Sequence, residues 1–471
     1  MNAVSHFAEL KHLERSDALP EPLVAALQQR FGDRLSRVRA VREHHGTDIS
    51  SYPVTPPDAV VFAESTDDVV AVVKLCGEHR VPVIPFGTGT SVEGHVLAVH
   101  GGVCVDLSRM NRVLEVNASD LDARVQAGVT RKQLNAYVKD TGLFFPIDPG
   151  ADASLGGMAS TRASGTNAVR YGTMRENVLG ATVVLADGGV IHVGGRARKS
   201  AAGYDLTRLF VGAEGTLGIL TELTLRLHPV PEGISAASCA FPNVRAAVDS
   251  VIEAIQCGIP IARVELLDTL TVTAVNRYSK LGLAEAPTLW FEFHGTPRGV
   301  EEQAEQMQGI ARDHGGVDFV WSSRPEERTK LWQARHDAYF ACLQLKPGSR
   351  MIATDVCVPI SRLADCIAAT EEDIARASMP IPLFGHVGDG NFHLMILVDP
   401  GSDAEIAEAW DLNARLVRRA IAMGGTCTGE HGIGLGKREF LVEEFGPAVD
   451  VMRAIKRVLD PANLLNPGKV L

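Results

Sequence analysis

The sequence predicts an α+β protein with two or three domains. The chain has 471 residues, of which 45% are hydrophobic, and this is enough to build more than one core. Short apolar runs surround helical patterns in the first half, whereas helix and strand patterns alternate in the second. The segment 229–233 contains two prolines and a glycine and separates these two secondary-structure patterns. We therefore predict a domain boundary there.

The first half contains a strand, helix, strand unit. The apolar runs 59–63 and 81–85 flank 66–76, which begins with a threonine suited to capping and carries helical periodicity. Further along, the alternating runs 180–186 and 190–193 are joined by Asp-Gly-Gly, which is a strong hairpin signal. These patterns predict sheets covered by helices.

The second half is interpreted as a separate α+β domain. Helical patterns fall near 244–256 and 299–313 and across 326–345, and a strand is predicted around 288–293. We expect four segments in the chain, namely a helical N-terminal segment (1–52), a first domain (53–232), a second domain (233–425) and a C-terminal segment (426–471).

The charge balance and the cysteines exclude several classes of protein. A net charge of −11 leaves no basic stripe for nucleic acid. The eight cysteines form no Cys-x-x-Cys pair, which speaks against a zinc ribbon or an iron–sulfur cluster and favours reduced thiols. No secretory leader is apparent, and no apolar run approaches a membrane span. We therefore expect a cytoplasmic protein whose only contact with a membrane would be peripheral, at its inner face.

Histidines and a carboxylate occur among glycines in two late motifs. The first holds His386 and His393 on either side of a predicted turn between two apolar runs, and the second holds Glu430 next to His431. Such side chains suit a divalent transition metal, and glycine lets the backbone bring them together. Single histidines are more often surface or hydrogen-bonded core residues, so the histidine pair alone fits a structural role equally well. A redox or hydrolytic metal site is the first hypothesis.

Glycine-rich segments in the first half predict a site for a large cofactor. The loop 86–91 follows a predicted strand, and such loops present backbone N–H groups to a pyrophosphate. Its spacing is not the Rossmann fingerprint, and the lysine-bearing phosphate loop is missing too. Residues 146–172 are dominated by small side chains, as in a linker, but Leu155, Met158 and Tyr171 do not suit one. We interpret this segment as backbone wrapped around a large planar ligand.

Seven motifs are spread over the chain between Pro53 and Leu471. They are Pro85–Ser91, Asp148–Gly150, Gly156-Gly157, Gly212–Gly218, Gly385–His393, Gly425–Gly434 and Asn466–Gly468. Together they resemble the vanillyl-alcohol oxidase type of flavoproteins, in the branch of the D-2-hydroxy acid dehydrogenases. Within this branch the pattern is most like the cytochrome-type D-lactate dehydrogenases and is also similar to the flavin subunit of glycolate oxidases.

The resemblance implies a role for each predicted segment. Residues 53–232 would form a two-subdomain FAD-binding domain of PCMH type. Residues 233–425 would form an α+β substrate or cap domain with the metal site, and 426–471 would return to the flavin and complete the active site. The fold class thus stays α+β, with the cofactor held outside a Rossmann fold.

The same resemblance implies which residues hold FAD. The loop 86–91 would hold the pyrophosphate, and Asn466 would lie near the isoalloxazine ring. Some relatives attach the flavin to a histidine whose place here is taken by Thr90, and His95 lies too far along, so we expect noncovalent FAD. The implied cofactor-binding residues are Pro85, Gly87, Thr88, Gly89, Thr90, Ser91, Asp148, Pro149, Gly150, Ser154, Gly156, Gly157, Gly165, Tyr171, Gly172, Glu214, Gly215, Gly218, Ile219 and Asn466.

One divalent metal ion, preferably Zn or Mn, and a catalytic base are also implied. The implied metal ligands are His386, His393 and Glu430. His431 would take the proton of a substrate hydroxyl, and Arg335 would pair with a substrate carboxylate. Asn391 would be a further substrate-binding residue. The less favoured alternative for Arg335 is a helix-surface arginine in a salt bridge, and Asn391 could equally shape its turn.

The expected reaction is FAD- and metal-dependent oxidation of a D-2-hydroxy acid to the 2-oxo acid, with the hydride passing to flavin N5. Relatives that oxidise D-2-hydroxyglutarate carry a Thr and a Lys where this chain has Tyr339 and Ala353. D-lactate or a longer apolar 2-hydroxy acid is therefore favoured. Electrons would pass to cytochrome c, a quinone or an electron-transfer flavoprotein, and a homodimer is the expectation from the family.

Three alternatives stay open from the sequence. The chain could be the flavin subunit of a glycolate oxidase complex, with an iron–sulfur partner on another chain. It could be a metallohydrolase that uses His386, His393 and Glu430. The third alternative, a binding module without enzymatic activity, would leave the histidines and the carboxylate without a purpose.

Overall fold

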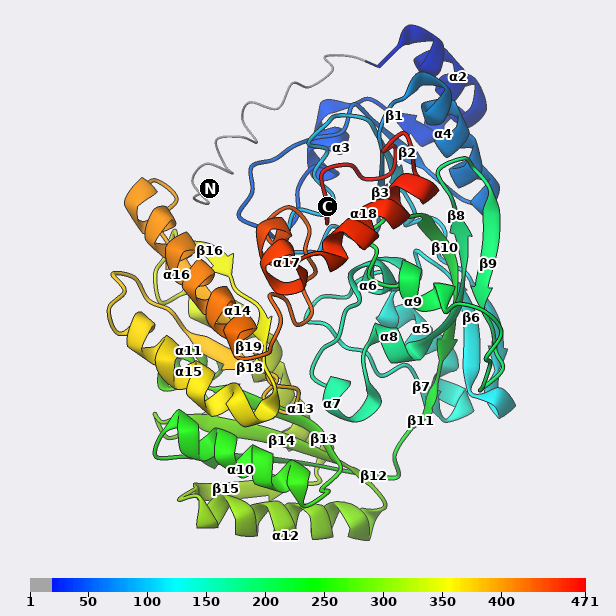
Figure 1. Ribbon diagram of the computed structural model, residues 1–471. Helices are drawn as coiled ribbons and strands as arrows, with labels where there is room; N and C mark the ends of the chain where they lie inside the picture. Colours follow the sequence, from blue (N-terminus) through cyan, green and yellow to red (C-terminus); the bar gives the residue numbers. More distant parts are fainter. Residues whose placement is uncertain (1–18) are drawn as a thin grey trace. The chain divides into compact units, whose positions relative to one another are not determined.

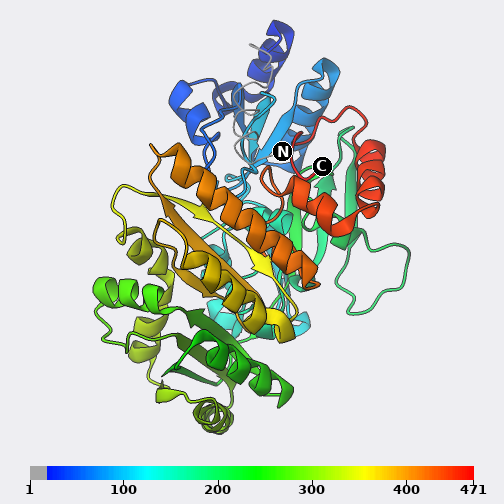
Figure 2. The same ribbon diagram turned by 60° about the vertical axis from the view of Figure 1, so that its left-hand side comes forward.

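The computed structural model describes residues 19–471, which fall into two compact units. The first unit comprises the chain up to Ser164 together with Gly172–Val230 and Glu430–Leu471, and the second comprises Gly165–Tyr171 and Pro231–Gly429. Residues 1–18 of the predicted N-terminal helical segment lie outside the described part of the chain. Figures 1 and 2 show two views of the ribbon.

The first unit begins with a four-stranded sheet in the order β1-β2-β4-β3. Strands β2, β4 and β3 are parallel, and β1 pairs with β2 in the antiparallel sense. The elements of this part are α2 (Glu21–Phe31), β1 (Leu35–Ser36), α3 (Arg39–His44), β2 (Ala59–Phe62), α4 (Thr66–His79), β3 (Val83–Phe86) and β4 (Val103–Asp106). The predicted strand, helix, strand unit is thus present as β2, α4 and β3.

Helix α4 follows directly from its sequence. The Ser65 side chain caps it by accepting a hydrogen bond from the Asp68 amide. Val69, Val72 and Cys76 recur at helical spacing and are fully buried against the sheet. Helix α2 adds its own buried apolar side chains to the same core, so residues 19–52 are part of the first unit.

A five-stranded antiparallel sheet in the order β5-β6-β10-β8-β9 forms the second layer of the first unit. The predicted hairpin is its β8–β9 edge. The strands of this part are β5 (Val113–Asn117), β6 (Asp122–Gln126), β7 (Leu143–Phe144), β8 (Val178–Val184), β9 (Val190–Gly194), β10 (Ile219–Arg226) and β11 (His228–Pro229). Its helices are α5 (Arg131–Val138), α6 (Leu155–Thr161), α8 (Met174–Asn177) and α9 (Leu206–Phe210), and the C-terminal helices are α17 (Arg438–Phe445) and α18 (Ala448–Leu459).

The second unit is built on one sheet in the order β15-β12-β14-β13-β18-β19-β16, with β17 also paired to β19. Its strands are β12 (Gly233–Ala240), β13 (Ile261–Leu267), β14 (Thr288–Gly295), β15 (Val317–Ser322), β16 (Arg350–Ala353), β17 (Val356–Cys357), β18 (Leu383–Gly385) and β19 (Asn391–Val398). Its helices are α7 (Ala168–Tyr171), α10 (Val244–Gln256), α11 (Thr269–Ser279), α12 (Pro297–Asp313), α13 (Pro325–His336), α14 (Ala338–Leu343), α15 (Ile360–Ile374) and α16 (Asp403–Ala422).

The two faces of this sheet are covered by different helices. Helices α11, α13 and α14 pack with Leu267, Trp290 and Met395 in one core cluster. Side chains alternate along a strand, so Phe291 projects to the opposite face. That face carries α10, α12, α15 and α16, which lie in one layer in both views (Figures 1 and 2).

The single helix predicted across 326–345 is wrong. The structure has α13 and α14, separated at Asp337. Trp332 of the first helix and Ala338 and Cys342 of the second belong to one buried cluster. The break lets both short helices turn their apolar sides into the same core.

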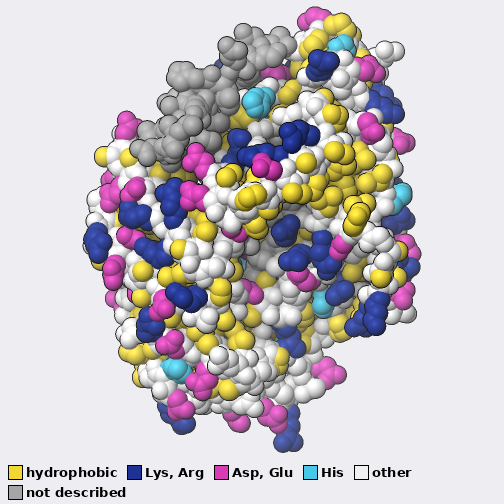
Figure 3. All heavy atoms as spheres, viewed as in Figure 1, with side chains coloured by type: hydrophobic (Ala, Val, Ile, Leu, Met, Phe, Trp, Pro, Cys, Tyr) yellow, Lys and Arg dark blue, Asp and Glu magenta, His cyan; other side chains and the backbone are white. Residues whose placement is uncertain are grey.

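Surface charges of both signs are interspersed on the face shown in Figure 3. This agrees with an ordinary charged fraction of 22% and a moderate net charge. Within residues 19–471, no helix combines the length and the hydropathy needed to cross a lipid bilayer.

Replacing Phe291 tests the core of the second unit. Phe291 is fully buried in β14, so Phe291→Ala should lower the free energy of unfolding by about 3–5 kcal/mol. Urea unfolding followed by circular dichroism measures the change. The matched control is Val320→Ala on the edge strand β15, where the side chain is 65% exposed and a change below about 0.5 kcal/mol is expected. Equal losses in the two variants would contradict this core assignment.

Candidate functional site

One face of the sheet in the second unit changes from apolar to polar along its strands. On β13, Glu265 shares this face with Leu267, and on β19, His393 shares it with Met395. The apolar positions belong to the cluster under α11, α13 and α14. The polar positions on the same strands therefore gather at one end of the sheet.

The carboxylate of Glu265 is the centre of this polar group. Its side chain is fully buried, and it accepts hydrogen bonds from Arg335 Nε at 2.8 Å and His386 Nδ1 at 2.5 Å. Burial opposes the charged form, but His386 and Arg335 hold the pKa of Glu265 below its ordinary value. The stability that this carboxylate contributes is present above its unfolded-state pKa and is lost as the pH falls through the lowered value.

The two predicted metal ligands in this unit lie beside each other. The ring centroids of His386 and His393 are 5.4 Å apart, with an angle of 80° between the planes. His386 Nδ1 faces Glu265, and His393 Nδ1 lies 3.2 Å from the carbonyl oxygen of Thr354. When each Nδ1 carries the proton, each Nε2 presents a lone pair, which is the arrangement of metal-binding histidines.

A tight turn brings the two histidines together, as the sequence predicts. Strands β18 and β19 are antiparallel, and Phe384 is paired with His393. Gly390 has φ +79°, and a Cβ there would collide with the carbonyl oxygen of Val358. A Cβ on Gly388 would lie 2.7 Å from a Val264 methyl group. Larger residues would push the turn away from the sheet.

Arg335 extends from α13 to the same carboxylate. Nε and Nη2 both lie 2.8 Å from Glu265 Oε2, and the guanidinium stacks over the Phe384 ring at 4.8 Å. Among residues 19–471, Nη1 has no hydrogen-bond acceptor. The predicted carboxylate-binding arginine is thus a largely buried side chain that forms a salt bridge with Glu265 and keeps Nη1 for a further acceptor.

The amide of Asn391 is buried and only half satisfied. Nδ2 donates to Asp355 Oδ1 at 2.8 Å and to the carbonyl oxygen of Val356 at 2.7 Å. The Oδ1 atom has no donor among residues 19–471. Asp355 also accepts a bond from the Thr428 hydroxyl at 2.7 Å, so a second buried carboxylate supports this part of the site.

Gly165–Tyr171, part of the predicted flavin-binding stretch, belongs to the second unit. The hydroxyl of Tyr171 lies 2.7 Å from His294 Nδ1, and His294 Nε2 lies 2.8 Å from a Glu292 oxygen. Tyr171 is therefore found on the polar half of the sheet face, and Gly165 belongs to the same unit, whereas Gly172 falls in the first unit.

In the first unit, the loop after β3 has the features of an anion cradle. None of the backbone N–H groups of residues 87–91 donates to a residue within 19–471. Gly89 has φ +64°, which turns the chain sharply. Consecutive free amides at the end of a strand are suited to a pyrophosphate.

The other glycine segments of the first unit close on this loop. A Cβ on Gly87 would overlap the hydroxyl of Ser154 at the start of α6, and a Cβ on Gly215 would overlap the ring of Pro85. Gly156 packs so closely that its Cβ would stand 2.6 Å from that of Ala127. Backbone thus replaces side chains where these loops meet, as a site for a large flat ligand requires.

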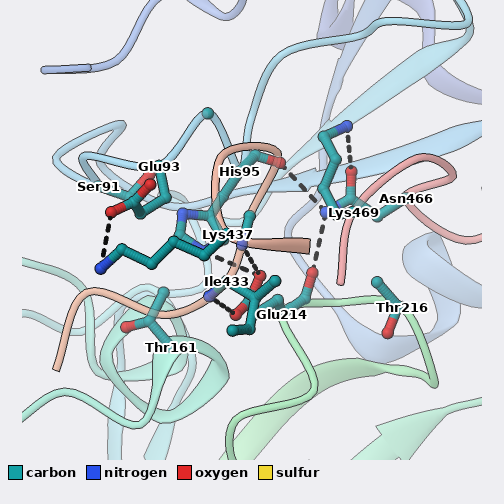
Figure 4. Close-up of polar contacts among 12 residues, drawn as sticks. Ser91, Glu93, His95, Thr161, Glu214, Thr216, Ile433, Lys437, Asn466 and Lys469 are labelled. Atoms are coloured by element: carbon teal, nitrogen blue, oxygen red, sulfur yellow. Dashed lines mark hydrogen bonds and ion pairs between the residues drawn. The ribbon is translucent and has the colours of Figure 1, made fainter. Parts of the chain in front are cut away.

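The C-terminal segment returns to these loops. Leu465 forms a parallel bridge with Val83, and the Asn466 amide donates to the Val83 carbonyl oxygen at 2.9 Å. Asn466 Nδ2 donates to the carbonyl oxygens of His95 at 3.1 Å and Glu214 at 2.9 Å (Figure 4). Asn466 therefore links the Glu214 segment, which the sequence assigns to the cofactor site, to strand β3, which precedes the glycine loop 86–91.

Glu430 and His431 also lie in the first unit. The Ser164 hydroxyl donates to Glu430 Oε2 at 2.6 Å, and His431 Nε2 lies 4.0 Å from Glu430 Oε1. The two side chains are only 14% and 20% exposed. One oxygen of Glu430 is thus bound by Ser164, and the other lies at the limit of ion-pair distance from the His431 ring.

Glu265 and Asp355 were not predicted from the sequence. A signal for Glu265 exists, because a carboxylate occupies a core-facing position in the alternating strand Ile261–Leu267. Such a residue needs a buried cationic partner, but its partners, Arg335 and His386, are 70 and 121 residues away. Asp355 lies outside any strand and gives no comparable signal.

Two domain families match this chain. The FAD binding domain matches residues 57–194, and the C-terminal domain of FAD linked oxidases matches residues 230–470. The chain belongs to the FAD-linked oxidases. The glycine loops, the free amides and the close backbone contacts of the first unit fit this cofactor. The metallohydrolase and the binding module are not supported by this assignment.

Two relatives show which FAD-linked oxidases this chain is similar to. "Probable D-lactate dehydrogenase, mitochondrial" of Danio rerio is 54% identical over 96% of this chain and 92% of its own. "Glycolate oxidase subunit GlcD" of Bacillus subtilis (strain 168) is 37% identical over 90% of this chain and 92% of its own. This FAD-linked oxidase is therefore an FAD-dependent enzyme similar to D-lactate dehydrogenases.

A solved structure supports the fold. P-cresol methylhydroxylase with bound substrate superposes with a TM-score of 0.80 at 18% identity, over 97% of this chain and 98% of its own. The predicted resemblance to the vanillyl-alcohol oxidase type and the α+β fold class are confirmed.

The cytoplasmic location expected from the sequence is wrong. The Danio rerio relative is named mitochondrial, and so are the D-lactate dehydrogenases [cytochrome] of Arabidopsis thaliana and two yeasts. These names point to the mitochondrion. The expectation relied mainly on the cysteine pattern, which does not distinguish one reducing compartment from another.

Replacing Gly87 tests the cofactor loops. Because a side chain at this position would displace Ser154 Oγ, we expect Gly87→Val to weaken FAD binding about tenfold, or about 1.4 kcal/mol. Equilibrium dialysis with FAD measures the dissociation constant. In the control, Gly195→Ala, a Cβ would meet no atom within 4 Å, and FAD affinity should stay unchanged. Unaltered affinity in Gly87→Val would show that FAD does not use this loop.

Proposed function

We propose that this FAD-linked oxidase converts D-lactate or a longer apolar D-2-hydroxy acid to the 2-oxo acid. The observation that carries the proposal is the buried group in which Glu265 orients both Arg335 and His386. The names of the relatives, D-lactate dehydrogenase and glycolate oxidase subunit, support a small 2-hydroxy acid as substrate. Bound FAD supplies the hydride acceptor.

Arg335 is proposed to bind the substrate carboxylate. Glu265 occupies Nε and Nη2 and leaves the Nη1 donors for a second carboxylate. A guanidinium pairs with carboxylates through parallel N–H bonds, and a rotamer fixed by Glu265 and Phe384 loses less entropy on binding.

His386 and His393 are proposed to hold one divalent metal ion together with Glu430. The Nδ1 contacts orient the two imidazoles, and a His₂–carboxylate set suits Zn or Mn. Such an ion would lower the pKa of a bound hydroxyl group.

His431 is proposed as the base that takes the proton of the substrate hydroxyl. An imidazole does this near neutral pH. Glu430 accepts a hydrogen bond from Ser164, and its other oxygen lies 4.0 Å from His431 Nε2. The two neighbours are proposed to serve as ligand and base. The Asn391 Oδ1 atom is a buried acceptor available to a donor on the substrate.

The substrate side chain is proposed to be uncharged. Tyr339 packs against the apolar cluster under α11, and Ala353 lies in β16 opposite Met395. Neither supplies the positive charge that would pair with the second carboxylate of a hydroxyglutarate. The likeness to the Bacillus subtilis subunit supports glycolate oxidation within a complex as the second candidate. The acceptor of the electrons is proposed to be a cytochrome, a quinone or an electron-transfer flavoprotein, and the cytochrome is favoured by the relatives' names.

A panel of 2-hydroxy acids tests the proposed function. Under anaerobic conditions, D-lactate and longer apolar D-2-hydroxy acids should bleach the visible flavin absorbance fastest, because Arg335 is proposed to bind their carboxylate and Tyr339 and Ala353 supply no charge for a second one. L-lactate and D-2-hydroxyglutarate should react at least about tenfold more slowly. Stopped-flow spectrophotometry measures the rates.

Two controls accompany the panel. Chelation should slow the bleaching, and Zn or Mn should restore it. Faster bleaching by glycolate than by D-lactate would favour the second candidate. No bleaching by any D-acid would overturn the proposal.

A further inference from the structure

The carboxylate of Glu214 accepts two hydrogen bonds from the loop that carries His431. The Ile433 amide donates to Glu214 Oε1 at 2.7 Å, and the Gly434 amide donates to Oε2 at 2.8 Å (Figure 4). Each oxygen thus accepts one backbone N–H, two and three residues after His431. All of these groups belong to the first unit.

The loop is shaped to make this contact. Gly432 has φ +84° and Gly434 has φ +49°, a region that favours glycine. A Cβ on Gly432 would stand 2.7 Å from Glu214 Oε1 and 2.9 Å from His95 Nε2. The backbone beside His431 therefore lies directly against the carboxylate.

Glu214 is itself held from three sides. His95 Nε2 lies 2.9 Å from Oε2, and both side chains are buried. Burial disfavours the charged carboxylate, but His95 and the two amides hold the pKa of Glu214 below its ordinary value. Its own amide donates to Ser160, and its carbonyl oxygen accepts from Asn466, each at 2.9 Å.

Glu214 also adopts a backbone conformation that is unfavourable for its residue type. Its φ is +52°, in the left-handed region where a non-glycine residue costs about 1–3 kcal/mol. Glycine would fit this backbone with less strain. We therefore expect the Glu214 side chain to make contacts that offset the strain of its backbone. Both oxygens of that side chain are directed at the 433–434 amides and at His95.

We propose that Glu214 is a positioning residue for His431, which it fixes by clamping the two amides that follow it. The proposal rests on the proposed function, in which His431 is the base. It gives Glu214 a different task from the cofactor-binding role that the family resemblance implies. A loop held at Ser164 by Glu430 and at Glu214 by residues 433 and 434 has little freedom left at residue 431.

The first test replaces Glu214 by Gln. The variant keeps the size of the side chain but turns one accepting oxygen into an NH₂ group that faces a backbone N–H. We expect kcat with D-lactate to fall about 100-fold, the loss that a shift of roughly 1 Å in a catalytic group can cause. FAD content and KM should stay unchanged, because the proposed contact affects only the position of His431. A purely structural role would instead lower FAD content with kcat per flavin unchanged, which would overturn the proposal.

A double-mutant cycle separates the two proposals. If Glu214 acts through His431, then Glu214→Gln causes no further loss of kcat in the His431→Ala background. If the losses of kcat in the two single variants multiply in the double variant, positioning through His431 is contradicted. Full turnover in His431→Ala alone would refute the base, which is a failure of the proposed function and is visible without Glu214.

A second pair of variants approaches the clamp from the loop. Ile433→Pro removes the amide that Glu214 Oε1 accepts, whereas Ile433→Ala removes the same side chain and keeps the amide. We expect kcat to be at least about tenfold lower in the proline variant than in the alanine variant. Equal kcat values in the pair would overturn the proposal even if Glu214→Gln failed to fold.

Discussion

A buried carboxylate, Glu265, is the constraint on which the second unit's polar site depends. It lies fully buried on strand β13, so its charge must be neutralised locally. Arg335 and His386 supply the neutralising groups from a helix and a turn distant in sequence. The same bonds orient the guanidinium and fix which imidazole nitrogen carries the proton. The same hydrogen bonds thus compensate the buried charge and preorganise the site.

The first unit is organised around the binding of a cofactor, which it achieves mainly with backbone groups. A large cofactor needs backbone donors and flat space, and the chain provides them by omitting side chains at Gly87, Gly156 and Gly215. Polar side chains also bind the backbone of these loops, as Asn466 does at two carbonyl oxygens. Such contacts lock loops without adding bulk to the space between them.

Local patterns predicted much of this structure. The β8–β9 hairpin, the turn between His386 and His393 and the glycine loop after β3 each have signals within about ten neighbouring residues, where turn chemistry and side-chain periodicity act. The motifs also identified the family, which requires only their order along the chain.

Interactions between distant segments were not accessible in this way. The break at Asp337 serves a shared core with α11, and the pairing of Glu265 with His386 spans 121 residues. The assignment of Gly165–Tyr171 to the second unit likewise depends on contacts such as Tyr171 with His294. Local propensity carries no information on these partners, because burial and pairing are decided by the complete fold.

The most direct test of the central claim is kcat/KM for D-lactate in Glu265→Gln. The glutamine preserves volume but removes the charge that holds Arg335 and His386, so the account predicts a loss of about 100-fold in kcat/KM with FAD content unchanged. A kcat/KM equal to that of the unaltered enzyme would show that the carboxylate does not organise the site and would contradict the account.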